Sequence, residues 1–165
     1  MARPPEPVQV VKQRRDAALD WLVDGVPYIR FLGIRFDRRG DELTAVLPYS
    51  DHLIGNPALP ALHGGVTAAF LETCAQVVLA WELLWPMVEA EGFDMAAPPS
   101  RAWPKTIDLT VDFLRSGLPR DAYARARVTR SGRRYASVHV QGWQDNTDRP
   151  FAQATGHFLM PSRDE

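Results

Sequence analysis

Five residues in the middle of the chain have types and spacing suited to acyl transfer: Asn56, His63, Gly64, Gly65 and Glu72. Paired glycines at the start of a predicted helix leave backbone N–H groups uncovered, with the positive end of the helix dipole behind them. Donors fixed in this way can stabilise a developing oxyanion. The glutamate lies two turns further along in an apolar run, where a charge costs free energy unless a function requires it. The pattern predicts acyl transfer to water.

The helix that would position these groups is predicted from about Gly64 into Trp85, with Pro86 as a stop or a kink. Glu72, Gln76 and Glu82 interrupt its apolar run, which favours a core helix over a membrane span. The stretch before it, residues 50–62, contains a glycine and two prolines and is predicted to be a loop.

The remaining elements predict an α+β domain, with an antiparallel sheet wrapped around that central helix. Residues 1–9 are proline-rich and are predicted to be a disordered tail, and residues 10–165 to form a single domain. An extra N-terminal helix is expected over residues 11–23. Strands are expected over residues 31–37, 42–48, 106–113, 122–129, 135–143 and 151–160. In the strand over 106–113, alternation predicts that Ile107, Leu109, Val111 and Phe113 face the core.

The composition of the chain argues against several classes of function. The net charge of −1 gives no reason to expect a nucleic-acid or membrane partner. The one cysteine, Cys74, excludes an intramolecular disulfide and a cysteine-based zinc site, and the four histidines have no metal-ligand spacing. We therefore predict no metal and no cofactor. The N-terminal residues lack an apolar signal region, so we expect a cytoplasmic protein.

The chain resembles the hotdog-fold acyl-CoA thioesterases, most closely the PaaI-like and 4-hydroxybenzoyl-CoA thioesterase group. The similarity covers roughly residues 28 to 160. The motifs that support it are Gly55–Pro57, Leu62–Val66, Glu72, Thr106–Arg115, the basic turn Arg130–Arg134 and the closing segment Gly156–Leu159.

The resemblance implies hydrolysis of an acyl-CoA thioester, with an aryl or medium-chain acyl group, to the free acid and CoA. By this resemblance, the N–H of Gly64 faces the thioester carbonyl oxygen, and Glu72 is the general base or the nucleophile. Asn56 orients water or the carbonyl, and His63 shapes the turn. The resemblance also implies a homodimer, or a homotetramer as a dimer of dimers, with each active site at a subunit interface.

Five further residues are predicted to contact substrate. Gly65 follows Gly64, and Gln76 lies one turn after Glu72 on the same helix face, where it could equally be a polar residue at the dimer seam. Arg130, Arg133 and Arg134 flank a turn, either as a solvated hairpin end or as ligands for the phosphates of CoA.

Two other functions remain open. Residues 72–76 resemble the helix of 3-hydroxyacyl-thioester dehydratases, which suggests a dehydratase-like lyase. Such a lyase needs a histidine about fourteen residues before the glutamate, and this chain has Ala58 there. A non-catalytic acyl-CoA binding protein would need nearly the same pocket. The sequence leaves open the acyl chain length, the carrier (CoA or acyl-carrier protein), the pathway and the tetramer arrangement.

Overall fold

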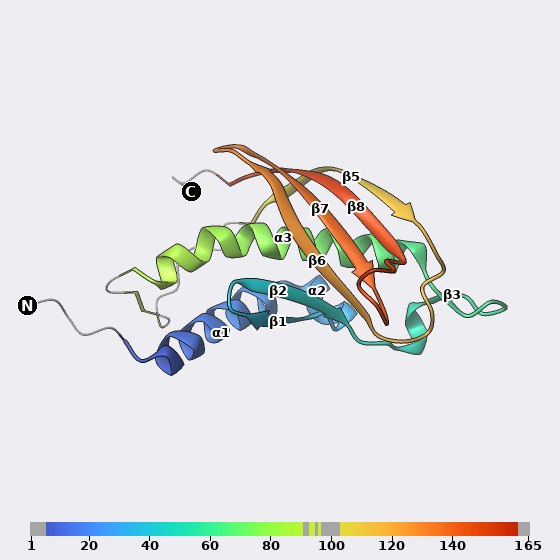
Figure 1. Cartoon of the computed structure of the whole chain (residues 1–165), viewed down its shortest axis with the longest axis horizontal. Helices are drawn as coiled ribbons and strands as arrows, with labels where there is room; N and C mark the ends of the chain where they lie inside the picture. Colours follow the sequence, from blue (N-terminus) through green and yellow to red (C-terminus); the bar gives the residue numbers. More distant parts are fainter. Residues whose placement is uncertain (1–5, 91–92, 95, 97–102, 162–165) are drawn as a thin grey trace, which may run out of the picture.

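A six-stranded antiparallel sheet curves around one long helix, α3 (Gly64–Val88), as Figure 1 shows. The computed structural model describes residues 6–90, 93–94, 96 and 103–161. The strand order is β1-β2-β6-β7-β8-β5. The strands are β1 (Arg35–Arg39), β2 (Glu42–Leu47), β5 (Lys105–Phe113), β6 (Ala122–Ser131), β7 (Tyr135–Trp143) and β8 (Ala152–Leu159). The predicted α+β architecture is confirmed.

Helix α3 forms the centre of the core. Its side chains Phe70, Leu71, Cys74 and Val77 are fully buried, and they pack under the apolar inner residues of the sheet. By length and composition alone α3 could cross a membrane, but 56% of its most apolar window is buried inside the domain, as expected for a core helix. Pro86 lies inside the helix, which ends two residues later, so of the predicted stop or kink at Pro86 the stop is wrong, and the kink stays a prediction.

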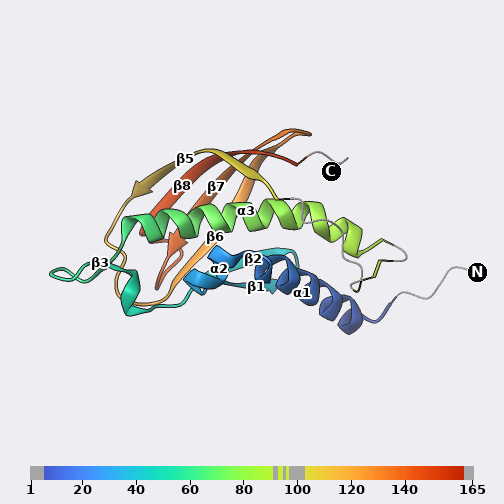
Figure 2. The ribbon, with the colours of Figure 1, turned by 180° about the vertical axis from the view of Figure 1, so that it is seen from behind.

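The N-terminal region contains two helices where the sequence predicted one. Helix α1 (Val8–Asp24) begins inside the segment assigned to the tail, and residues 1–5 lie outside the described part of the chain. Helix α2 (Pro27–Leu32) replaces the start of the strand predicted over residues 31–37. Pro27 occupies the first turn of α2, where its fixed φ favours a helix, and Gly33 ends it with a φ of 70°. Helix α1 packs against α3 on the side away from β5 to β8, as Figures 1 and 2 show.

The loop predicted over residues 50–62 has short elements of its own. A 3₁₀ turn, η1 (Asp51–Leu53), leads into a small hairpin of β3 (Ile54–Asn56) and β4 (Ala61–Leu62). This hairpin projects from the end of the molecule, beyond the six-stranded sheet (Figures 1 and 2). The prolines at positions 57 and 60 lie in its tip, where no ladder hydrogen bond is needed, so they do not prevent strand pairing.

Strand β5 is an edge strand with a β-bulge. Thr106 pairs with Phe158 and Asp108 with His157, so Ile107 has no partner on β8. The extra residue reverses the alternation on its N-terminal side. Thr106 therefore faces the inside, half-buried, whereas Ile107 is 56% exposed. Phe113 lies on the other side of the bulge, at the end of the strand beside Gly64, and is 58% exposed. The predicted core-facing set is correct for Leu109 and Val111 and wrong for Ile107 and Phe113.

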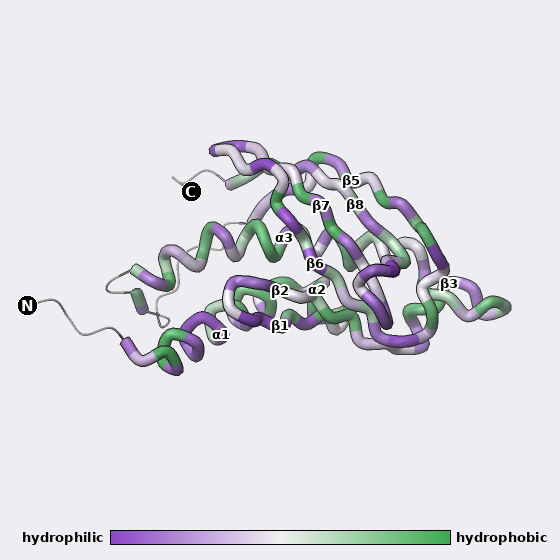
Figure 3. Tube along the Cα trace, viewed as in Figure 1, coloured by the Kyte–Doolittle hydropathy of each residue, from purple (hydrophilic) through white to green (hydrophobic). Residues whose placement is uncertain are grey.

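The hydropathy of the residues along the chain agrees with this arrangement of one core helix under a sheet. Figure 3 shows hydrophobic residues along α3 and alternating hydrophobic and hydrophilic residues along the strands. This is the pattern of a sheet with one face on the core and one face in solvent.

Candidate active site

The N-terminus of α3 presents an open backbone donor. His63 is the N-cap residue, and its Nδ1 accepts the N–H of Gly65 over 2.9 Å. Because Nδ1 accepts, the ring is the neutral tautomer with its proton on Nε2. The N–H of Gly64 has no acceptor within the described residues, and both glycines are exposed. One of the two predicted donors is therefore available for an oxyanion, and the other is occupied by the histidine.

Gly65 and Gly55 leave the space that this cap needs. A Cβ on Gly65 would lie 2.9 Å from Nδ1 of His63, and a Cβ on Gly55 would lie 2.7 Å from its Cα. The N–H of His63 donates to the carbonyl of Leu53 over 2.8 Å, which fixes the turn before the helix. This geometry agrees with the predicted role of His63 in shaping the turn.

Glu72 belongs to a three-residue hydrogen-bond network between α3 and β5. The hydroxyl of Thr106 donates to Oε1 of Glu72 over 2.6 Å, and Nε2 of Gln76 donates to the same hydroxyl over 3.1 Å. All three side chains are half-buried. The network holds one carboxylate oxygen, and among the described residues Oε2 has no hydrogen-bond partner. Gln76 thus contacts the carboxylate through Thr106.

Sequence reasoning missed Thr106 because a regular strand would direct its side chain to solvent. The bulge at Ile107 turns it toward α3 instead. A threonine among strand residues gives no signal of a bulge, so only the register reveals the contact.

Cys74 lies two residues after Glu72 on the same helix but takes no part in this site. It is fully buried, and burial raises the pKa of its thiol to about 12. A thiol with such a pKa stays protonated at neutral pH and is a poor nucleophile.

Asn56 lies in the projecting β3–β4 hairpin. Its Oδ1 accepts the N–H groups of Ala58 and Leu59 over 3.0 and 3.3 Å, so the side-chain carbonyl forms a local turn. The amide NH₂ remains as a donor. Within the described part of the chain Asn56 makes no hydrogen bond with Glu72.

The basic turn between β6 and β7 lies at the same end of the sheet as Thr106. Thr106 pairs with Phe158, which pairs with Ala136, which in turn pairs with Ser131. Three strand spacings separate the ends of this row, about 14 Å. Arg130, Arg133 and Arg134 next to it are exposed and form no ion pair with a described residue.

The donor and the carboxylate are far apart in one chain. Gly64 and Glu72 are eight residues apart on a helix that rises 1.5 Å per residue, which gives about 12 Å along the axis. A single thioester carbonyl, which spans one bond, cannot contact both groups. One chain therefore supplies two half-sites.

Comparison with known proteins identifies the family. A family model for the acyl-CoA thioesterase N-terminal domain matches residues 56–159, which contain all the residues described above except Leu53 and Gly55. A medium/long-chain acyl-CoA thioesterase of Salmonella typhimurium, YigI, is 30% identical over 86% of this chain and 90% of that protein.

Solved structures show the same fold. A thioesterase-superfamily protein from Shewanella oneidensis aligns with a TM-score of 0.70 at 23% identity, over 91% of this chain and 97% of that one. A Bacillus halodurans protein solved with CoA aligns with a TM-score of 0.61 at 21% identity, over 96% of each chain.

The chain is thus a member of the acyl-CoA thioesterase family, built on the hotdog fold. Its reaction is the hydrolysis of an acyl-CoA thioester to a free acid and CoA. Recognition of the family and of this activity from the sequence is confirmed.

Proposed function

We propose that the protein hydrolyses medium- to long-chain acyl-CoA thioesters at active sites that two subunits build together. The observation that supports shared sites is the axial separation of about 12 Å between the backbone positions of Gly64 and Glu72 in one chain. The chain-length class comes from the named activity of the Salmonella relative, which refines the predicted aryl or medium-chain substrate.

The edge strand β5 supports the dimer. It pairs only with β8 within the described residues, so its other edge is open. The exposed side chains Ile107 and Phe113 lie on it, and the ring of Phe113 comes within 3.5 Å of where a Cβ of Gly64 would be. An open edge with exposed apolar residues is a suitable surface for a second copy. The back-to-back and face-to-face tetramers remain alternatives.

In the proposed reaction, Gly64 of one subunit donates its N–H to the thioester carbonyl oxygen. The positive end of the α3 dipole stabilises the oxyanion that forms when the carbonyl carbon is attacked. The amide NH₂ of Asn56, on the hairpin beside this helix end, donates to the carbonyl or to the water. His63 acts by holding the turn, and Gly65 supports the cap rather than the substrate.

Glu72 of the partner protomer acts on water or on the carbonyl carbon. As a general base, its free oxygen removes a proton from water as the water attacks, the C–S bond breaks, and the proton passes to the thiolate of CoA. As a nucleophile, it forms a mixed anhydride while the C–S bond breaks and CoA leaves as a thiolate. Water then hydrolyses the anhydride, which releases the acid and supplies the proton for the thiolate. In both routes Thr106 and Gln76 orient the carboxylate. Arg130, Arg133 and Arg134 bind the phosphates of CoA.

The experiment is free-thiol release from short, medium, long and aryl acyl-CoA thioesters by the wild type and by Glu72→Ala. We expect the highest kcat/KM on medium and long chains and a loss of about 10² or more in the variant. Asp24→Asn, at the exposed end of α1, is the control carboxylate and should retain full activity.

The same assay separates the alternatives. Stoichiometric binding of acyl-CoA without thiol release would favour the non-catalytic binding protein. Elimination of water from a 3-hydroxyacyl-CoA would favour the lyase, although Ala58 provides no base for it. Release of the acid from acyl-carrier protein thioesters, but not from CoA thioesters, would show that the carrier is acyl-carrier protein. A cytoplasmic location and a single domain over residues 10–165 stay predictions.

A further inference from the structure

Strand β6 places three arginines on the outer face of the sheet, and two of them have no described partner. Arg125 bonds Glu42 over 2.8 Å and the hydroxyl of Thr44 over 2.9 Å. Arg127 and Arg130 are exposed, and neither forms an ion pair or a side-chain hydrogen bond with a described residue. Two neighbouring cations repel each other unless a counter-charge lies between them. An anion bound at this place would therefore relieve a repulsion that the fold leaves in place.

A second β-bulge brings Arg130 to the outer face. The register of β6 on β7 shifts at Thr129, which has no partner, and Arg130 pairs with Ser137. In a regular strand Arg130 would pair with Ala136, which is fully buried, and its side chain would be directed into the core. Because of the bulge, Arg127 and Arg130 are consecutive residues of the outer face, roughly 7 Å apart. The hydroxyl of Thr129 donates to the carbonyl of Ser137 over 3.0 Å and holds the bulge.

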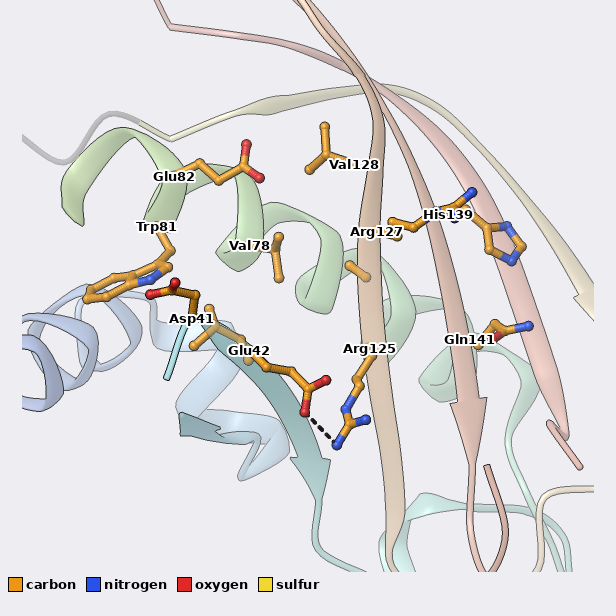
Figure 4. A pocket seen from close by; sticks show the side chains of 12 residues that line it. Asp41, Glu42, Val78, Trp81, Glu82, Arg125, Arg127, Val128, His139 and Gln141 are labelled. Carbon is orange, nitrogen blue, oxygen red and sulfur yellow. Dashed lines mark ion pairs between the residues drawn. The ribbon is translucent and has the colours of Figure 1, made fainter. Parts of the chain in front are cut away.

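Two further donors lie beside these arginines on β7. His139 pairs directly with Arg127, and Ser137 with Arg130, so the Cβ atoms of each pair are about 5 Å apart. Figure 4 shows the side chain of Arg127 extending from β6 toward His139. Ser137 and His139 are half-buried, and neither side chain bonds a described residue. A hydroxyl donates one hydrogen, and even a neutral imidazole has one N–H donor. We call these four residues the β6–β7 cluster.

The β6–β7 cluster matches a phosphate monoester better than a carboxylate. A phosphate monoester has a charge of about −1.5 to −2 at pH 7 and three strong acceptor oxygens. It can pair with both guanidinium groups and still accept hydrogen bonds from the hydroxyl and the imidazole. A carboxylate has one charge and two oxygens, which a single arginine fork already satisfies.

Four carboxyl groups near this surface are paired or lie on the inner side of the sheet. Asp108, on β5, bonds His157 over 2.8 Å. Asp41 and Glu42, at the end of the β1–β2 hairpin, are bonded by other arginines, over 3.2 and 2.8 Å. Glu82 belongs to α3, which lies on the inner side of the sheet. The cluster thus keeps its positive charge.

We propose that the β6–β7 cluster binds a phosphate monoester dianion. Two sources carry this group. CoA carries it as its 3′-phosphate, and this source rests on the proposed function, in which the adjacent basic turn binds phosphates of CoA. A separate phosphorylated ligand carries the same chemistry. In the first case, the contacts with CoA extend from the turn onto the outer face of the sheet as far as Arg127.

The test compares, by titration calorimetry, the binding of CoA and of 3′-dephospho-CoA, which differ only in this group. With CoA as the source, the wild type should bind CoA about tenfold or more tightly than 3′-dephospho-CoA. Arg127→Gln should weaken the binding of CoA about three- to tenfold and leave that of 3′-dephospho-CoA unchanged. Arg127→Lys keeps the charge without the fork and should recover part of the loss. Arg149→Gln, an exposed arginine in the β7–β8 loop at the opposite end of the sheet, is the matched control and should change neither affinity.

Inorganic phosphate tests the second source. Equal binding of CoA and 3′-dephospho-CoA, together with phosphate binding that Arg127→Gln and Arg130→Gln weaken, would assign the site to a separate phosphorylated ligand. Equal binding of the two nucleotides without such phosphate binding would overturn the proposal. A preference for CoA that Arg127→Gln and Ser137→Ala both leave intact would overturn it as well.

These measurements need no turnover, so they separate this proposal from the thioesterase proposal. A protein that shows the predicted CoA preference but releases no thiol would refute only the proposed hydrolysis. If CoA does not bind at all, the proposed function loses its support, and the binding of inorganic phosphate alone decides whether the β6–β7 cluster is a phosphate site.

Discussion

The backbone N–H of Gly64 can be removed with little other change. Gly64 is the first residue of α3, a position that favours proline, and His63 before it has the extended ψ of 133° that a following proline requires. Gly64→Pro therefore deletes the proposed oxyanion donor while the helix start is preserved. We expect kcat to fall by about 10² to 10³, measured as thiol release.

Gly64→Ala is the matched control because it adds a side chain and keeps the N–H. Its Cβ would lie 3.5 Å from the ring of Phe113, an ordinary van der Waals contact. This variant should keep most of its activity. Equal losses in both variants would indicate a steric effect, and full activity in the proline variant would exclude Gly64 as the donor.

Thr106 offers a second test at the residue scale. Thr106→Val keeps the shape of the side chain but removes the hydroxyl that bonds Glu72 over 2.6 Å. A carboxylate that turns by about 1 Å loses alignment with the reacting carbon, so we expect kcat to fall by roughly 10²-fold with little change in KM. Thr106→Ser restores the hydroxyl and should recover most of the rate. An equal loss of kcat in the valine and serine variants would instead indicate that Thr106 has a packing role.

The sequence allowed candidate site residues to be predicted but not their contacts. Glu72, Gly64, Asn56 and His63 could be proposed because residue type and spacing are properties of the chain itself, and their catalytic roles stay predictions. Thr106 was missed because its orientation depends on the bulge at Ile107, which is set by pairing with β8. The occupied N–H of Gly65 was missed because a cap depends on a side-chain rotamer.

At the scale of elements, the N-terminal cap of α3 is part of the proposed site and also stabilises the fold. His63→Ala removes the acceptor for the N–H of Gly65, which should cost about 1 kcal/mol of unfolding free energy and lower Tm by roughly 2 to 4 °C. His63→Asn supplies another capping oxygen and should restore most of this loss. Thermal unfolding followed by circular dichroism measures both, and an unchanged Tm in the alanine variant would contradict the capping role.

Elements with strong periodicity were predictable, and elements set by a single residue were not. Strand β7 and the start of α3 agree with the sequence because their apolar pattern is continuous. Helix α2 was not predicted, and its last two residues were assigned to a strand, because six residues are too few to show a helical period. Its helical state depends on Pro27 and Gly33 at its two ends.

At the scale of the whole molecule, the length of α3 separates the two reacting groups. A helix is rigid over two turns, so the backbone positions of Gly64 and Glu72 stay about 12 Å apart along the axis within one chain. The open edge of β5 and the projecting β3–β4 hairpin are the surfaces through which a second copy could bring them together. The proposed dimer is thus a requirement of the proposed chemistry.

Mixing two inactive variants tests this requirement. In a dimer with one Glu72→Gln chain and one Gly64→Pro chain, one site contains both defects and the other contains neither. Random reassortment makes half of the dimers mixed, so activity should recover to about one quarter of the wild-type value. The two proteins are unfolded together, refolded and assayed for thiol release, with each variant refolded alone as the control. If each site belonged to a single chain, every site in the mixture would keep a defect and no activity would return.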